Sequence, residues 1–299
     1  MVKITEPKQN ILVSFSGGET SGFMIDYLLR KFPDRNYTFI FANTGEENEE
    51  TLQFVENVAN YYKIKVIWIE YERLGFKEVT FKTAYRSHDA TEIANKWQNH
   101  PFRKYISHDM IPNIQNPTCS RELKEYIITR YMSVNGMTKK HYNTAIGIRA
   151  DEINRVGDYY YPLVLADISK QMVNKFWDKM PFRLQLKGYE GNCKTCWKKS
   201  FRKLVTIARE NPERFEFFKQ MEIEYSNYIK PTQADKHQPP ICFFRGYKTV
   251  SDIFEMAKDL SIENAGDDSR NYIYQSSIFH DGTELDSING CSESCEAFN

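Results

Sequence analysis

The amino-acid sequence predicts an α/β protein, a doubly wound parallel sheet with a helical C-terminal elaboration. Short apolar runs alternate with amphipathic helical patterns at the start of the chain, and such alternation is typical of right-handed parallel βαβ units. A glycine-rich turn joins the first apolar run to the first helical pattern. The last third of the chain carries helical patterns, prolines and a polar tail, which predicts an extension of a different kind.

The first elements follow from hydrophobic periodicity. Apolar runs predict strands at Ile11–Ser14, Tyr37–Phe41, Lys65–Ile69 and Tyr142–Ile148. A helical pattern follows the first strand, and a second one spans Thr51–Tyr62. Residues 72–117 are less regular, and we expect there a helix within Glu92–Gln98 and loops that cover the sheet edge.

Later helices are predicted from periodicity and capping residues. They lie at Arg121–Tyr131, from an N-cap at Ser169 to Lys179, and at Lys199–Glu210, Pro212–Tyr225 and Ser251–Leu260. Prolines predict an extended connector over residues 226–247. We therefore expect a main domain over residues 1–210 and a helical extension with a cysteine-containing tail over residues 211–299.

Composition limits the class of protein. The formal net charge is zero, which removes any whole-chain argument for binding nucleic acid or membranes. There is no secretory signal pattern and no apolar run of membrane-spanning length. We expect a cytoplasmic protein without a membrane partner. In that reducing compartment the six cysteines are poor candidates for structural disulfides, and their clustering indicates metal or redox chemistry.

The turn after the first strand has the features of a phosphate-binding loop. Its sequence is Ser-Gly-Gly-Glu-Thr-Ser at residues 16–21. Glycines let the backbone approach phosphate oxygens, and the following helix presents N–H groups and a positive dipole end to an anion. A Walker loop is excluded because no Gly-Lys-Ser/Thr follows. An ordinary strand–helix turn is the alternative.

These residues resemble the PP-loop superfamily of adenine nucleotide α-hydrolases, whose signature is Ser-Gly-Gly-x-x-Ser. The resemblance implies binding of ATP or an adenylyl sulfate at the carboxyl edge of the sheet. A segment that begins at Asn43 resembles the Asp-Thr-Gly segment of phosphoadenosine phosphosulfate (PAPS) reductases, although Asn43 replaces the acid and a plain turn is the alternative. The residues assigned to the nucleotide are Ser14, Ser16, Gly17, Gly18, Glu19, Thr20, Ser21, Asn43, Thr44, Gly45 and Gly147.

A further block, Gly147-Ile148-Arg149 with Arg155 following, resembles the Gly-Ile-Arg segment of the same reductases. Guanidinium groups hold phosphate or sulfate oxygens in bidentate geometry, so we predict catalytic roles for Arg149 and Arg155. The alternative is a surface salt-bridge cluster with Asp151 and Glu152. These blocks follow one another in the same order as in the family, and they extend the resemblance over roughly residues 11–205.

Cysteines indicate a metal centre. Cys193 and Cys196 form a C-x-x-C pair in a glycine-containing loop, a spacing that suits zinc or an iron–sulfur cluster. Cys119 lies in a segment that resembles the cysteine region of adenylylsulfate (APS) reductases, with Thr118 where their first cysteine stands. The resemblance implies a 4Fe-4S cluster on Cys119, Cys193 and Cys196, with zinc as the alternative. A fourth ligand is open, and Cys242 is expected to be an inert buried residue.

The C-terminal tail holds Cys291 and Cys295. PAPS reductases carry a catalytic cysteine in such a tail, so these two are candidate nucleophiles. They are also candidate cluster ligands, and chance is the alternative.

Three functions remain open. The first is reduction or transfer of sulfur from an adenylylated substrate, with a thioredoxin-type protein as reductant. The second is ATP cleavage with Mg²⁺ and sulfur insertion into tRNA or DNA, as in related PP-loop enzymes. The third is a non-catalytic nucleotide-binding protein with structural zinc, an idea that Asn43 supports.

Overall fold

A five-stranded sheet forms the centre of the protein. The computed structural model describes residues 7–87, 97–270 and 297–298. The strands are β1 Asn10–Ser14, β2 Asn36–Asn43, β3 Val66–Glu72, β4 Gly75–Val79 and β5 Tyr142–Ile146, in the order β4-β3-β2-β1-β5. β1 pairs in parallel with β2 and β5, and β2 pairs in parallel with β3. The predicted α/β fold is confirmed.

The edge strand β4 was not predicted. It pairs antiparallel with β3, with Glu72 opposite Gly75, so a two-residue connection closes a hairpin at the sheet edge. A hairpin needs no crossover helix, and this one therefore interrupts the strand–helix alternation from which the other strands were predicted. The sheet is mostly parallel, with one antiparallel edge strand.

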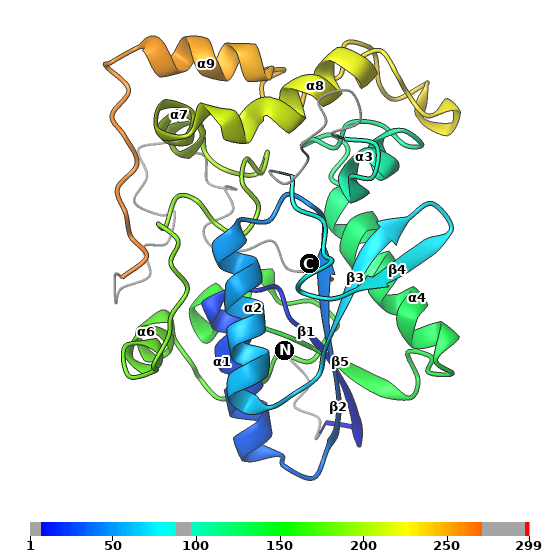
Figure 1. Cartoon of the computed structure of the whole chain (residues 1–299), viewed down its shortest axis with the longest axis vertical. Helices are drawn as coiled ribbons and strands as arrows, with labels where there is room; N and C mark the ends of the chain where they lie inside the picture. The colour runs from blue at the N-terminus through cyan, green and yellow to red at the C-terminus, as the bar shows by residue number, and fades with distance from the viewer. Residues whose placement is uncertain (1–6, 88–96, 271–296, 299) are drawn as a thin grey trace.

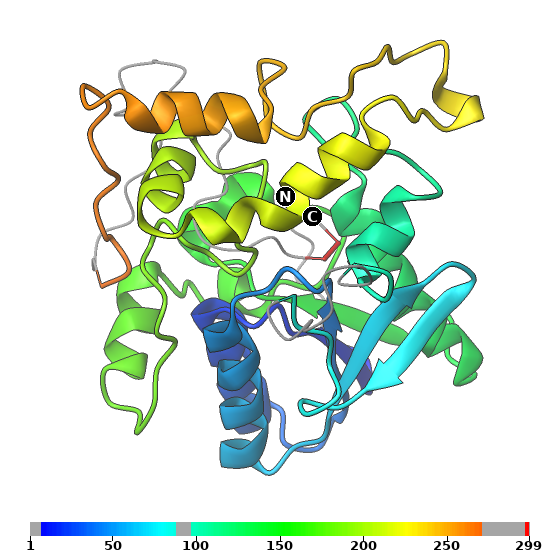
Figure 2. The same ribbon diagram turned by 45° about the horizontal axis from the view of Figure 1, so that its top comes forward.

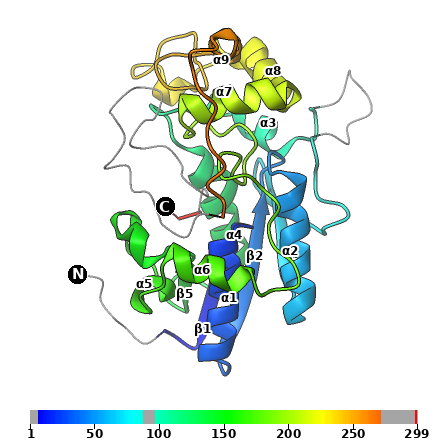
Figure 3. The ribbon, with the colours of Figure 1, turned by 90° about the vertical axis from the view of Figure 1, so that its left-hand side faces the viewer.

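Helices cover both faces of the sheet (Figure 1). One face carries α1 Glu19–Lys31, α2 Glu49–Tyr62 and α6 Lys170–Trp177, and Figure 3 shows these three together. The other face carries α3 Pro101–Ile106, the π-helix η1 Arg121–Tyr126 and α4 Ile127–Val134. Neighbouring residues of β1 point to opposite faces of the sheet, as strand geometry requires. Val13 packs in the core beneath α1, α2 and α6, and Leu12 packs in the core on the side of α3 and α4.

Short elements connect the sheet to the C-terminal extension. They are the 3-10 helix η2 Ala150–Arg155 and the helix α5 Pro162–Leu165. The last element before the extension is α7 Phe201–Glu210, and the extension contains η3 Pro212–Phe215, α8 Glu216–Tyr225, η4 Pro231–Gln233 and α9 Val250–Lys258. Its helices lie together beyond one end of the sheet (Figure 2). Their apolar side chains, such as Phe217 and Phe243, belong to the same buried cluster as Leu12 of β1.

Several predicted boundaries shift. The helix predicted at Arg121–Tyr131 is a π-helix followed by α4 and ends at Val134. Ser169 is the N-cap of α6, which ends two residues before the predicted Lys179. Of the helix predicted within Glu92–Gln98, Trp97 and Gln98 lie in a turn, and residues 92–96 lie outside the described residues. Among the helices described, none is long and apolar enough to cross a membrane.

Candidate functional site

The loop between β1 and α1 has a fixed and unusual backbone. Gly17 has a φ of +80°, and a Cβ there would lie 2.5 Å from Thr51 Cγ2. Only glycine meets both conditions without strain. Gly18 is the N-cap of α1, and no side chain caps the helix there. The helix therefore begins with a backbone N-terminus that a ligand can approach.

The hydroxyl groups of the loop mainly shape the loop itself. Ser16 Oγ lies 2.9 Å from Ser21 Oγ, and Ser21 Oγ donates to the Gly18 carbonyl oxygen at 2.9 Å. Ser14 is buried at the end of β1, and Gly147 lies directly against Ser21. These bonds hold the first turn of α1 against the ends of β1 and β5.

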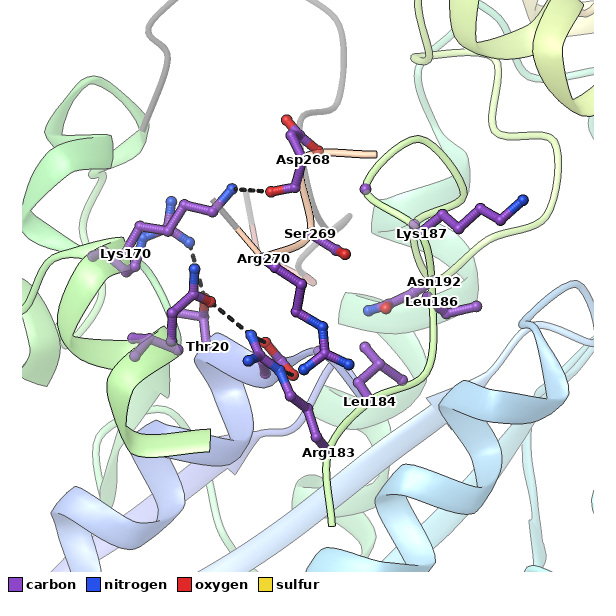
Figure 4. A pocket seen from close by; sticks show the side chains of 17 residues that line it. Thr20, Lys170, Arg183, Leu184, Leu186, Lys187, Asn192, Asp268, Ser269 and Arg270 are labelled. Carbon is purple, nitrogen blue, oxygen red and sulfur yellow. Dashed lines mark hydrogen bonds and ion pairs between the residues drawn. The ribbon is translucent and has the colours of Figure 1, made fainter. Parts of the chain in front are cut away.

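A pocket opens at this N-terminus (Figure 4). It has about 680 Å³ of space, open solvent included. Gly18, Glu19 and Thr20 form its floor. Five cationic side chains line it, against the two carboxylates of Glu19 and Asp268. The cations are Arg149, Lys170, Arg183, Lys187 and Arg270. This excess of positive charge favours an anionic ligand.

Arg149 joins the pocket to a salt-bridge cluster. Its side chain is 1% exposed and pairs with Asp151 at 3.0 Å and with Glu152 at 3.4 Å, and its Nη1 donates to Thr20 Oγ1 at 3.0 Å. Arg155 pairs with Glu152 and is not among the pocket-lining residues. Arg149 is thus a buried member of the salt-bridge cluster that also lines the pocket, and its catalytic role stays a prediction. Arg155 belongs to the same cluster through Glu152, and its catalytic role stays a prediction as well.

Several lining residues were missed by the sequence analysis. Arg183 donates to both carboxylate oxygens of Glu19, at 2.7 and 3.0 Å, and so neutralises the acidic residue of the loop. Lys170 begins α6 and is buried. Asn192 donates from Nδ2 to the Ser16 carbonyl oxygen at 2.9 Å. These residues come from separate segments and share no spacing motif, so packing alone brings them together.

Asn43 has a structural role at the end of β2. Its Nδ2 donates to Glu70 Oε1 at 2.7 Å and to the Tyr85 carbonyl oxygen at 3.0 Å, and its Oδ1 accepts from the Gly45 N–H. An aspartate here would set a second carboxylate against Glu70, which explains the departure from the Asp-Thr-Gly pattern in electrostatic terms. Burial raises the pKa of Glu70.

Thr44, the residue after Asn43, also bonds within the protein. Thr44 donates from its N–H and its hydroxyl to the buried carboxylate of Glu47, whose pKa is raised by burial and lowered less by Lys124 at 3.9 Å. As far as the chain is described, Asn43, Thr44 and Gly45 do not line the pocket. Asn43 and Thr44 instead bond to Glu70, Tyr85 and Glu47.

The C-x-x-C loop lies at the same carboxyl edge of the sheet. Asn48 of the β2–α2 connection donates from its N–H to the Asn192 carbonyl oxygen at 3.0 Å and from Nδ2 to the Gly191 carbonyl oxygen at 2.6 Å. The Lys194 N–H donates to the Glu46 carbonyl oxygen at 2.9 Å. Gly191 and Asn192 line the pocket, so Cys193 follows the pocket wall directly in the chain.

The two thiols of this loop interact with each other. A hydrogen bond from Cys193 to Cys196, with burial second, raises the pKa of Cys193, and the same bond lowers the pKa of Cys196. The Lys199 ammonium lowers the pKa of Cys196 further and opposes part of the rise at Cys193, and it also donates to the Cys193 carbonyl oxygen. Cys196 is therefore the more acidic thiol of the pair.

The described residues do not complete a metal centre. Cys119 begins the helical segment that continues into η1 and packs against the core. In residues 7–87, 97–270 and 297–298, no three His, Cys, Asp or Glu side chains are grouped as metal ligands. Cys242 is buried, as expected. Cys291 and Cys295 lie outside the described residues. The described thiols alone do not fit a four-ligand site, and the predicted convergence of Cys119 with the pair stays a prediction.

Comparisons with known proteins agree with this geometry. Residues 10–155 match the phosphoadenosine phosphosulfate reductase domain family. The chain is 25% identical over 292 residues to the uncharacterized nin region protein ORF290 of Escherichia phage lambda, with 96% of this chain and 94% of the phage protein covered. It is 26% identical over 223 residues to an uncharacterized protein of Methanocaldococcus jannaschii, with 73% of this chain and 42% of that protein covered. Residues 10–155 are thus similar to a PAPS reductase domain, a likeness that supports a nucleotide-binding protein of the PP-loop type.

Proposed function

We propose that this protein is an enzyme that binds an adenine nucleotide by its phosphate or phosphosulfate group and reduces or transfers the attached sulfur. The observation that carries the proposal is the pocket at the uncapped N-terminus of α1, walled by Arg149, Lys170 and Arg183. A helix N-terminus with convergent guanidinium and ammonium groups suits phosphate and sulfate oxygens.

In the reductase version, a cysteine thiolate attacks the sulfur of an adenylyl sulfate. The S–O bond to phosphate breaks, an S–S bond to the cysteine forms, and the nucleotide leaves with the oxygen. A second thiol, supplied by a thioredoxin-type dithiol protein, then attacks the cysteine sulfur. Sulfite leaves and a mixed disulfide joins the two proteins. The second thiol of the reductant attacks this bond, which releases the enzyme cysteine as a thiol and oxidises the reductant to a disulfide. Cys291 or Cys295 is the proposed nucleophile, and Arg149 stabilises the anionic group.

A second version keeps the site and changes the chemistry. The loop from Ser16 to Ser21 has both glycines and both serines of the ATP-cleaving pattern, and the serine pair holds the loop closed at 2.9 Å. This feature favours ATP, with Mg²⁺, pyrophosphate release and a tRNA or DNA acceptor. Products separate the two versions: sulfite from PAPS with reduced thioredoxin, or pyrophosphate from ATP with Mg²⁺ and nucleic acid. Formation of neither product under anaerobic conditions would favour a non-catalytic nucleotide-binding protein.

Nucleotide binding itself is tested at Gly18. The residue has an extended backbone, φ −94° and ψ 161°, which any residue adopts, and aspartate is a favoured N-cap. Gly18→Asp should therefore fold normally, occupy the N-terminus of α1 with its own carboxylate and abolish ATP and adenylyl sulfate binding in calorimetry. Gly18→Asn is the matched control, because it caps without the charge and should retain more affinity. Undiminished binding by folded Gly18→Asp would refute the site.

The metal centre is a separate proposal. We propose that Cys119, Cys193 and Cys196 hold a 4Fe-4S cluster, with zinc as the alternative, and that a further ligand completes it. Anaerobically purified protein should be brown, and Cys193→Ala should lose iron and colour together. Cys242→Ala should keep both, because Cys242 lies in the C-terminal extension with its sulfur near the Pro240 carbonyl oxygen. Stoichiometric zinc without iron would overturn the cluster and keep the ligands.

A further inference from the structure

A segment of the C-terminal extension returns to the nucleotide pocket. Residues 259–270, here called the strap, follow α9 and run back towards α1 and α6 (the orange trace in Figures 1 and 3). Its last three residues, Asp268, Ser269 and Arg270, line the pocket (Figure 4). The strap lies far outside the stretch that matches the reductase domain family.

The first half of the strap is held by α7. Arg209 makes most of these contacts, and the Ala265 N–H adds a bond to Thr206 Oγ1 at 2.8 Å. The Arg209 guanidinium donates to the carbonyl oxygens of Ala257, Asp259 and Ile262 at 2.9, 2.7 and 2.7 Å and to Asn264 Oδ1 at 2.6 Å. Four bonds from one planar group fix the path of the chain as it leaves α9.

The second half is fitted closely against the rim of the pocket. The Gly188 N–H donates to Asp267 Oδ1 at 2.9 Å, and Lys170 Nζ donates to the Asp268 carbonyl oxygen at 3.4 Å. A Cβ on Gly188 would lie 1.7 Å from Asp268 Oδ1 and 2.9 Å from the Ser269 nitrogen. The strap can lie this close to the rim only because residue 188 has no side chain.

Arg270 differs from the other cations of the pocket. Arg149, Arg183 and Lys187 are each paired with a carboxylate. For Arg270, the described part of the chain offers neither a hydrogen bond nor an ion pair, although its side chain reaches into the pocket beside Arg183 (Figure 4). Arg270 therefore adds positive charge that the described residues leave uncompensated.

We propose that the strap completes the anion site and that Arg270 binds the outer phosphate or sulfate group of the nucleotide. The inference rests on the proposed function and assigns part of the ligand to a segment outside the reductase domain. A guanidinium group that meets a terminal phosphate or sulfate makes paired, charge-assisted hydrogen bonds. The loop and the N-terminus of α1 then hold the phosphate next to the nucleoside, and the strap holds the outermost phosphate or sulfate group of the nucleotide.

The test compares ligands with different numbers of phosphates. Calorimetry with ATP, AMP and adenosine is done on the full-length protein and on Arg270→Gln. Loss of a charge-assisted contact predicts that ATP affinity falls about tenfold to a hundredfold, that AMP affinity falls less, and that adenosine affinity is unchanged. Arg130→Gln is the matched control, because Arg130 is an exposed residue of α4 on the opposite face of the sheet. It should leave ATP affinity as in the wild type.

Two further variants test the strap without touching Arg270. Gly188→Ala keeps every charge and should displace the strap, and Arg209→Gln should release its first half. Each variant should lower the affinity for ATP more than the affinity for adenosine. Arg270→Gln should cost less ATP affinity in the Arg209→Gln background than in the wild type, because both substitutions act through the same contact. Circular dichroism verifies that each variant is folded.

The outcomes separate this inference from the proposed function. Wild-type protein that binds none of these nucleotides, nor adenylyl sulfate, would overturn both. Binding that Gly18→Asp abolishes and Arg270→Gln leaves unchanged would overturn the strap proposal alone. An equal loss of ATP and adenosine affinity in Arg270→Gln would show a structural role and would overturn it too.

Discussion

Replacing Gly17 by alanine should show how strongly the phosphate loop depends on this glycine. The residue has a φ of +80°, where a side chain costs about 1–2 kcal/mol. The new Cβ would also lie 2.5 Å from Thr51 Cγ2 and 3.2 Å from Phe41 and Val55. Forcing a methyl group into a packed interior costs typically about 1–3 kcal/mol. The two terms together predict a loss of about 2–5 kcal/mol in the free energy of unfolding.

The chain offers a matched control for the first of these terms. Gly136 has a φ of +79°, and a Cβ there would meet no atom within 4 Å. Gly136→Ala should therefore lose only about 1–2 kcal/mol. The difference between the two variants isolates the clash at Gly17, and Thr51→Ser, which removes Cγ2, should recover part of it in the double variant.

Urea denaturation followed by circular dichroism measures these differences, and calorimetry with ATP reports on the loop. Gly17→Ala should lower ATP affinity as well as stability, because the loop cannot keep its path. Equal losses for Gly17→Ala and Gly136→Ala would refute the packing argument. A Gly17→Ala variant as stable as the wild type would refute the loop conformation itself.

Two charge variants give further predictions. Arg183→Gln removes a cation of the pocket together with the guanidinium that pairs with Glu19, and it should lower ATP affinity about tenfold or more, whereas Glu19→Gln, measured by the same calorimetry, should not lower it. Asn43→Asp sets a second carboxylate against Glu70. Because burial already raises the pKa of Glu70, the folded chain binds that proton more readily than the unfolded chain, and this contribution to stability falls as pH rises above the ordinary carboxyl range. Asn43→Asp should deepen that fall as the pH rises above the ordinary carboxyl range in denaturation experiments, and a loss independent of pH would contradict the argument.

Local signals account for the parts of the fold that were predicted. The strand before Ser16, the glycine turn and the helix after it lie within twenty residues, so periodicity and backbone chemistry suffice to find them. The same holds for Ser169, whose position before an amphipathic run predicts a helix start. The hairpin strand β4 was missed because only a short alternating run, Gly75–Val79, distinguishes it from a loop.

The pocket could be predicted only in part. Its floor is local in sequence, but Lys170, Arg183 and Arg270 reach it from α6, from the chain after α6 and from the strap. No spacing rule links such residues, because their meeting depends on how the extension packs on the sheet. Asn43 shows the reverse case: the sequence presents it as a departure from a motif, and the bond to Glu70 gives the reason.

The zero net charge of the chain conceals a local separation of charge around the C-x-x-C loop. Gly191 and Asn192 line the cationic pocket, whereas Lys194 lines a second pocket in which acidic residues outnumber basic ones. Its carboxylates are Glu46, Glu49, Glu50, Glu213 and Glu216. Residues on the two sides of Cys193 thus line pockets of opposite charge. An anionic nucleotide is attracted to the first pocket and repelled from the second, so its phosphates are drawn to the α1 side of the thiol pair. The zero net charge of the whole chain therefore says nothing about the charge of an individual site.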